Sequence, residues 1–157
     1  MKQTPLGEMR CSAARALNEV GPWWSLLLVR CCLQGLSRFN EFQVALGIGK
    51  NTLSIRLKEL IHDGLLTKVH ASDGSKFHEY QLTEKGVELA PVILALSTWG
   101  DKWLPHELGP SVRLHDNRSG KTVGVGFVDD EGEAVSPEFI QWTPGEGVIA
   151  SLSQGGR

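Results

Sequence analysis

The residues best suited to specific polar contacts lie in one short stretch, GIGKNTLSIRLKELIHDGLLTK, at positions 47 to 68. Its leucines, Leu53, Leu57 and Leu60, recur at the spacing of one helix face, and the other side chains are mostly amides, hydroxyls and cations. The stretch therefore predicts a helix that buries its leucines and turns hydrogen-bonding groups outward.

The outward side chains are of the types that contact double-stranded DNA. Asparagine can form two hydrogen bonds with adenine, serine and threonine can bond bases or phosphates, and an isoleucine can meet a thymine methyl group. Lysines contact phosphates, which position a protein without specifying a sequence. The candidate DNA contacts are Lys50, Asn51, Thr52, Ser54, Ile55 and Lys58. The alternative is an ordinary solvent-exposed helix face, which is common on globular proteins.

Four further cations are candidate DNA contacts. Arg56 lies nearer the leucine face, so it can serve packing and a local ion pair as readily as DNA. Lys68 and Lys76 flank the segment ASDGSK and can reach phosphates beside the site, and Arg38 precedes the neighbouring helix.

The elements around this stretch predict a winged helix. A first helix is expected at 11–20 and ends at Gly21-Pro22. A second is expected at 23–33, where apolar residues on all sides indicate a helix in the core. A third is expected to begin after Ser37, which can cap it, and to end at Gly47. In that third helix Glu41 follows Ser37 too late for a strict capping box. Two short helices joined by a glycine turn form a helix-turn-helix, and Asp73-Gly74 then predicts a β-hairpin.

A long helical segment follows the hairpin. Thr83 is expected to cap it, and Pro91 to kink or restart it, because proline lacks an N–H and clashes with the preceding turn. Four apolar residues at alternating steps of four and three predict a helix-helix seam. These four residues are Val92, Leu96, Trp99 and Trp103.

The chain beyond Leu108 changes character, with more glycine and fewer helix formers. The runs at 112–116, 121–128 and 137–143 predict strands of a small antiparallel meander. The expected fold is mainly α with a small β part (α+β): a winged helix-turn-helix domain for DNA binding and dimerisation at 1–108, a β-rich extension at 109–150 and a disordered tail at 151–157.

Composition and charge indicate a soluble globular protein. No apolar run reaches the roughly 18 residues that cross a bilayer, and the N-terminus lacks a secretory signal, so we expect a cytoplasmic protein without a membrane partner. A net charge of −2 argues against nucleic acid, but residues 1–104 hold 12 Lys and Arg against 10 Asp and Glu, and residues 105–157 hold 4 against 8. The acidic excess belongs to the C-terminal part.

No pattern of catalytic or metal-binding residues is present. The five histidines are scattered, no Ser-His-Asp or paired-carboxylate pattern stands out, and Cys31-Cys32 lacks zinc-site spacing, so we expect neither an enzyme nor a metal or cofactor. Cys11 opens the first helix, where the helix dipole favours a thiolate that reacts with oxidants or electrophiles. The alternative for Cys11 is a small buried residue.

Two long segments, CSAARALNEVGPWWSLLLVRCCLQGLSRFNEFQVALGIGKNTLSIRLKELIHDGLLTK and HEYQLTEKGVELAPVILALSTWGDKWL, resemble the HxlR-type winged-helix transcriptional regulators. The resemblance covers about residues 11 to 104. It implies a homodimer on operator DNA, with the dimer formed by the first and last long helices. The dimer interface expected from this resemblance is Leu17 together with the seam residues Val92, Leu96, Trp99 and Trp103. It also places Lys50, Asn51, Thr52, Ser54 and Arg56 in the recognition helix, and some members use a cysteine at the position of Cys11 as a sensor of oxidants, quinones or aldehydes.

The chain departs from this family at three places. In the wing, Lys76-Phe77-His78-Glu79-Tyr80 lacks the prolines that are common before the family's Val-Glu-Tyr segment. Gly21-Pro22-Trp23-Trp24 stands where the family usually has Gly-Gly-Lys/Arg-Trp, which removes a cation. Longer relatives carry cysteine pairs resembling a zinc ribbon, whereas this C-terminal part has no cysteine. We therefore expect its sheet to be held by apolar packing through Phe127, Phe139, Ile140 and Trp142.

These observations together predict a homodimeric DNA-binding transcriptional regulator that reads a palindromic operator. A response to redox agents or electrophiles through Cys11 and an unidentified small-molecule effector belong to this hypothesis. The rival is a winged-helix module that binds a protein or a small molecule through the C-terminal β extension.

Overall fold

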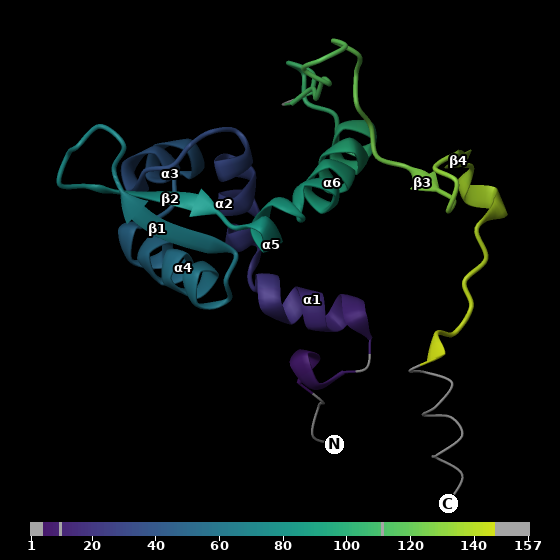
Figure 1. The fold of residues 1–157 in the computed structure, drawn as a ribbon, viewed down its shortest axis with the longest axis horizontal. Helices are drawn as coiled ribbons and strands as arrows, with labels where there is room; N and C mark the ends of the chain where they lie inside the picture. Colours follow the sequence, from purple (N-terminus) through teal and green to yellow (C-terminus); the bar gives the residue numbers. More distant parts are fainter. Residues whose placement is uncertain (1–4, 10, 111, 147–157) are drawn as a thin grey trace, which may run out of the picture.

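The computed structural model describes residues 5–9, 11–110 and 112–146. Helices dominate the first two thirds and short strands the rest (Figure 1). The elements in chain order are η1 (Leu6–Glu8), α1 (Ser12–Val20), α2 (Trp23–Leu33), α3 (Phe39–Leu46), α4 (Lys50–His62), β1 (Leu66–His70), β2 (His78–Leu82), α5 (Glu84–Val87), α6 (Ala90–Trp103), β3 (Phe127–Val128), β4 (Ala134–Val135) and η2 (Pro137–Phe139).

The core is built around α2, as its all-round apolar sequence predicts. Leu28 and Cys31 of α2 are fully buried, as are Phe42 of α3 and Leu53 of α4. Burying a large apolar side chain stabilises a fold by about 1.5–3 kcal/mol. The leucine face of α4 is therefore held against α2, and the opposite face of α4 is left outside.

The turn between α3 and α4 depends on Gly47, which takes the left-handed conformation at φ 61°. Ile48, next to it, is buried and anchors the turn. The predicted Ser37 cap is wrong: Arg38 is the N-cap residue, so Glu41 has capping-box spacing and its carboxylate accepts from the backbone N–H groups of Ser37 (2.8 Å) and Arg38 (2.9 Å).

Strands β1 and β2 form the predicted antiparallel hairpin, with Leu66 opposite Leu82 and His70 opposite His78. Its tip has Gly74 at φ 73°, and the Asp73 carboxylate accepts from Ser75 N at 3.0 Å. Helices α3 and α4 lie on either side of this hairpin (Figure 1). The arrangement is the predicted winged helix.

The long segment after the hairpin restarts at Pro91, as predicted. Thr83 Oγ1 accepts from Gly86 N and caps the short helix α5, and Pro91 lies in the first turn of α6. A proline is tolerated there because first-turn N–H groups have no partner within the helix. Helix α6 then projects away from the winged helix, as Figure 1 shows.

The C-terminal extension contains two small antiparallel pairings. His115 bridges Thr122, and β3 pairs with β4. The strand predicted at 137–143 is wrong, because residues 137–139 form the 3-10 helix η2. The predicted apolar packing is also wrong: Phe127 is 48 % exposed, Phe139 78 % and Trp142 90 %. Hydrogen bonds of tight turns shape this segment, such as Gly120 N to Asp116 O at 2.7 Å.

The expected tail at 151–157 lies outside the described residues, and the division at residue 108 stays a prediction. Within the part of the chain that the structure describes, no helix is long and apolar enough to cross a membrane.

Candidate nucleic-acid interface

Helix α4 separates its buried residues from its exposed ones cleanly. Leu57 and Leu60 are at most 2 % exposed, whereas Ile55 on the far side is 49 % exposed. The side chains that are candidates for DNA contact and that the structure leaves exposed are Lys50, Asn51, Thr52, Ile55 and Lys58, and Ser54 is partly exposed. The structure therefore brings all six together on one outward face.

The N-terminus of α4 is open, whereas that of α3 is closed. Gly49 is the N-cap of α4, no side chain caps this end, and no acidic residue lies in its first turn. At α3 the Glu41 carboxylate already occupies the backbone donors. Free N–H groups and the positive end of a helix dipole attract anions such as phosphate. Of these two helices, only α4 offers that end.

The cations near α4 differ in how far they are neutralised. Arg56 pairs with Glu59 one turn later, and its side chain is only 21 % exposed. Lys50 and Lys58 are exposed, and neither makes an ion pair with another described residue. The positive charges of the two lysines are therefore not offset by a carboxylate. Arg56, in contrast, covers apolar surface, as its place near the leucines predicts.

Arg38 joins α3 to the hairpin. Its guanidinium donates to Asp73 at 2.7 Å and to Glu79 at 3.0 Å, and Glu79 also accepts from Ser72 Oγ at 3.1 Å. The bond from Arg38 holds the pKa of the Asp73 carboxyl well below its ordinary value and lowers that of Glu79. Two carboxylates therefore oppose one guanidinium, so Arg38 positions the wing tip more than it attracts phosphate.

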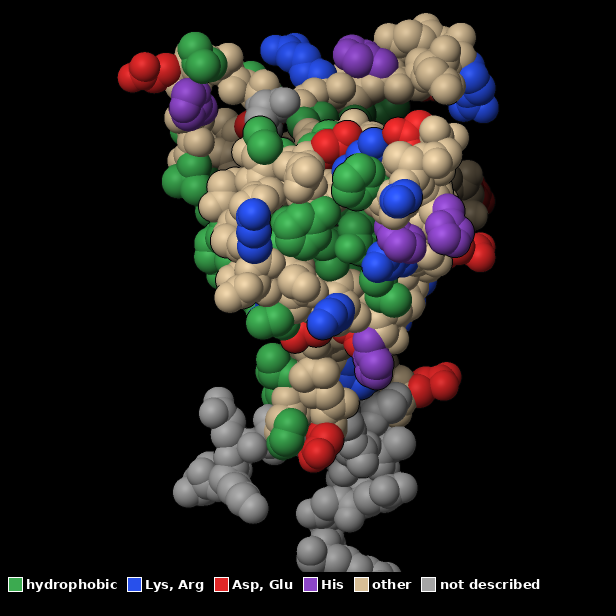
Figure 2. Space-filling model, turned by 90° about the vertical axis from the view of Figure 1, so that its left-hand side faces the viewer, with side chains coloured by type: hydrophobic (Ala, Val, Ile, Leu, Met, Phe, Trp, Pro, Cys, Tyr) green, Lys and Arg blue, Asp and Glu red, His purple; other side chains and the backbone are tan. Residues whose placement is uncertain are grey.

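A hollow of about 320 Å³ lies between α3 and the hairpin. Lys68 and Lys76 line it together with Asn40 and the exposed Phe77. Figure 2 shows this side of the molecule, where basic and histidine side chains surround a central apolar patch. Asn40 and Phe77 were not predicted from the sequence, since only the folded hairpin brings them beside the lysines.

Two histidines on the hairpin were also missed. His70 and His78 occupy opposite positions on β1 and β2, and their rings stack with centroids 5.3 Å apart. The hairpin register would have revealed this pair, because residues directly opposite on one face interact.

The cysteines differ in exposure. Cys11 is exposed at the N-cap of α1, and Cys31 is buried in the core. Burial, with a smaller effect of the neighbouring Cys31, raises the pKa of Cys32 to about 12. Cys11 is therefore the accessible thiol. Among the described side chains, no group of three or more His, Cys, Asp and Glu is placed to hold a metal.

The seam residues of α6 point outward from the chain. Val92 is 47 % exposed, Leu96 55 %, Trp99 57 % and Trp103 61 %. Leu17 of α1 is exposed as well, although α1 and α6 lie apart in Figure 1. This contiguous apolar face of α6 is unusual for a surface that meets only water.

Comparison with known proteins places these features in one family. Residues 19–108 match the model of HxlR-like helix-turn-helix proteins. The uncharacterised HTH-type transcriptional regulator Rv3095 of Mycobacterium tuberculosis is 36 % identical over 143 residues, which cover 90 % of each chain. That alignment reaches well beyond the winged helix, so the relative shares much of the extension.

Two solved structures have similar folds. PA1607, a candidate transcription factor, superposes with a TM-score of 0.75 at 35 % identity, covering 89 % of this chain and 99 % of its own. The redox regulator HypR in its reduced form gives a TM-score of 0.54 at 30 % identity, covering 59 % of this chain and 92 % of its own. These likenesses confirm the predicted α+β winged-helix class, and the relatives are transcriptional regulators. The chain belongs to the HxlR-like helix-turn-helix family and is a DNA-binding transcriptional regulator of that type.

Proposed function

We propose that the protein acts as a homodimer that reads a palindromic operator with the outer face of α4. The observation that carries this proposal is the exposed, unpaired polar face of α4 beside an N-terminus that nothing caps. A two-fold dimer presents this face twice, and half-sites about 34 Å apart match one turn of DNA. The operator is therefore an imperfect palindrome.

The side chains of α4 have different roles in DNA binding. Asn51, Thr52 and Ser54 lie in the first turn and a half of the helix, the part that reaches base edges in the major groove, and Ile55 meets a thymine methyl. Lys50 and Lys58 contact phosphates, and Arg56 supports the helix through Glu59.

The hairpin has a secondary role in DNA binding. Lys68 and Lys76 bind phosphates that flank the site, using the hollow shared with Asn40. Arg38 holds the wing tip through Asp73 and contributes little charge of its own. The wing therefore lies beside the recognition helix as a support and contributes little charge to DNA binding.

Asn51→Ala is expected to lose about 1–3 kcal/mol of DNA-binding free energy at particular base pairs and nothing elsewhere, because a two-bond amide contact reads one base. Selection of bound duplexes from a random pool, with wild type and variant in parallel, measures this. The variant's motif should lose information at one position in each half-site. An unchanged motif would remove Asn51 from base recognition.

Lys58→Ala is expected to weaken binding to all sequences alike. It should also reduce the slope of log affinity against log salt concentration by about one, because each phosphate contact releases counterions. Affinity measured against salt concentration gives the slope. Arg118→Ala is the matched control, since it also removes one cation, from a side chain 87 % exposed on the extension. Equal slopes for Lys58→Ala and the control would contradict the assignment.

The rival function, protein or small-molecule binding through the extension, is favoured by exposed apolar side chains such as Phe139 and Trp142. The same salt series separates the two functions. A DNA complex weakens steeply with salt, whereas an apolar contact does not. A regulator that works on chromosomal DNA is expected in the cytoplasm, and we do not expect it to be an enzyme.

Cys11 is proposed as the point where oxidants or electrophiles act, since it is exposed whereas Cys31 is buried. Its place on α1, one of the proposed dimer elements, connects its chemistry with dimer geometry. HypR, a redox regulator, is a structural relative.

Cys11→Ser is expected to abolish the release of operator DNA by benzoquinone, which forms a carbon–sulfur bond with a single thiol and takes up its proton to give the hydroquinone adduct. Release is followed by fluorescence anisotropy of labelled DNA. Cys32→Ala serves as the control and should still release DNA, because the partly exposed Cys32 thiol has a raised pKa, stays protonated and does not react in the wild type. Release that persists in Cys11→Ser would remove this cysteine from the hypothesis.

A further inference from the structure

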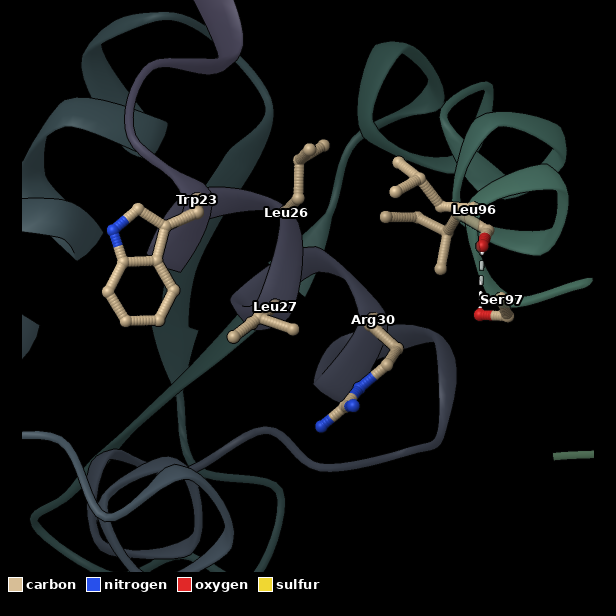
Figure 3. Close-up of a pocket in the computed structure, with 7 residues that line it drawn as sticks. Trp23, Leu26, Leu27, Arg30, Leu96 and Ser97 are labelled. Atoms are coloured by element: carbon tan, nitrogen blue, oxygen red, sulfur yellow. Dashed lines mark hydrogen bonds between the residues drawn. The ribbon is translucent and has the colours of Figure 1, made fainter. Parts of the chain in front are cut away.

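A cavity of about 300 Å³ opens between α2 and α6, outside the proposed DNA interface. Its wall is mostly apolar: Trp23, Leu26 and Leu27 come from α2, and Ile93 and Leu96 from α6. Figure 3 shows Leu96 and Ser97 facing the α2 residues across the opening, with Arg30 between Leu27 and Ser97 in this view. A cavity of this size and lining suits a small organic ligand.

A second cavity of about 160 Å³ adjoins the first and shares Arg30, Ile93 and Ser97 with it. Its other walls include Val112 and Leu114 of the C-terminal extension. Arg30 therefore stands where the two spaces meet. Ligand-sized apolar cavities of about 150 Å³ already admit a single aromatic ring.

Arg30 is the cation that these cavities share, and no carboxylate partner for it is present among the described residues. Arg38, Arg56 and Arg118 each pair with a carboxylate. Arg30 makes a single weak contact, 3.9 Å from Nη2 to Cys31 Sγ, and its Nε is buried without a hydrogen-bond partner. A buried donor left unsatisfied is costly, by about 1–3 kcal/mol. The Arg30 guanidinium is therefore not neutralised by any described side chain.

We propose that this cavity binds a small amphipathic organic anion, an aromatic carboxylate, with its carboxylate on the Arg30 guanidinium. The ring lies among Leu26, Leu27 and Ile93. Guanidinium and carboxylate match in shape and charge, and their bonds strengthen in apolar surroundings. Ser97 adds no donor, since its hydroxyl donates to Ile93 O at 2.9 Å. Selectivity for the anion thus comes from Arg30.

The position of the cavity connects it to DNA binding, and this part rests on the proposed function. Helix α2 belongs to the winged-helix core, whereas α6 carries the proposed dimer face. Leu96 belongs to both, because it lines the cavity and is 55 % exposed on that face. A ligand wedged between the two helices changes the angle between them, and with it the spacing of the two α4 helices. Such a ligand alters operator affinity only if it binds the helix arrangement that fits DNA and the arrangement that does not with unequal affinity.

The binding test uses the full chain without DNA and two probes of equal shape, 1-naphthoate and neutral 1-naphthamide. Titration calorimetry should show naphthoate binding at least about tenfold tighter than the amide, as a charged hydrogen bond provides. Arg30→Met, which keeps the apolar stem, should remove this preference and leave amide binding unchanged. Arg30→Lys should retain part of the preference, and Arg118→Met all of it. Equal binding of the two probes to the wild type, or no binding at millimolar concentration, would overturn the proposal.

A second variant keeps the test valid if Arg30→Met does not fold. Leu27→Trp fills the cavity from the α2 wall and should block both probes, whereas binding of naphthoate that survives this substitution argues against the site. Operator affinity with and without naphthoate is then measured separately. Binding without any change in operator affinity would overturn the regulatory part alone. A protein that binds naphthoate but no DNA contradicts the proposed function and not the ligand site.

Discussion

Trp99→Glu is expected to convert the protein to monomers and to abolish operator binding at concentrations where the wild type binds. The Trp99 side chain is 57 % exposed at the centre of the apolar α6 face, so the fold of one chain does not depend on it. In a two-fold dimer each substitution occurs twice across one interface. Losing two buried tryptophans at an interface weakens it by about 4 kcal/mol or more, close to a thousandfold in the dimer dissociation constant.

Sedimentation velocity over a range of protein concentrations measures this change, and circular dichroism checks that the helices persist. The matched control is Thr98→Glu, which adds the same charge to an exposed neighbour that points away from the seam. A Trp99→Glu variant that stays dimeric wherever Thr98→Glu does would show that α6 is not the dimer interface.

Gly86→Ala is expected to lower the free energy of unfolding by about 3 kcal/mol, because overpacking a tight site forces the backbone to shift. A Cβ at this buried position would lie 2.9 Å from Leu82 Cδ2 and closer still to the Leu65 carbonyl oxygen. That oxygen cannot move freely, since it accepts from Thr83 N at 3.1 Å. The substitution therefore disrupts the packing between the hairpin and α5.

Urea unfolding at one fixed protein concentration measures the loss, since a dimer's stability depends on concentration. Gly100→Ala is the control. It lies within α6, where an added Cβ meets nothing within 4 Å, so helix propensity should raise stability by about 0.5–1 kcal/mol. If both alanines shifted stability equally, the close approach at Gly86 would not matter.

The sequence predicted the helical body well because its signals are local. The spacing of Leu53, Leu57 and Leu60, the turn at Asp73-Gly74 and the restart at Pro91 each depend on neighbours within a few residues. The structure confirms all three. The predicted N-cap of α3 was wrong by one position, Ser37 instead of Arg38, because serine is the stronger capping type and local propensity favours it.

What the sequence could not predict comes from contacts between distant segments. The ion pair of Arg38 with Glu79 joins residues 41 apart, and the cavity beside Arg30 exists only where α2 meets α6. The structure of the extension could not be predicted for another reason. Alternation such as Val123 and Val125 indicates a strand, yet in the described part of the extension only Phe127–Val128 and Ala134–Val135 form strands, and each of the two valines is 43 % exposed.

The division of α4 into a buried leucine face and an exposed polar face has a consequence for evolution. Positions such as Asn51 and Thr52 are exposed, so substitutions there change stability by about 0.5 kcal/mol or less. Duplicated copies of such a gene can thus diverge in the sites they recognise while inheriting one scaffold. Few mutations separate one specificity from another, and none of them needs a compensating change inside.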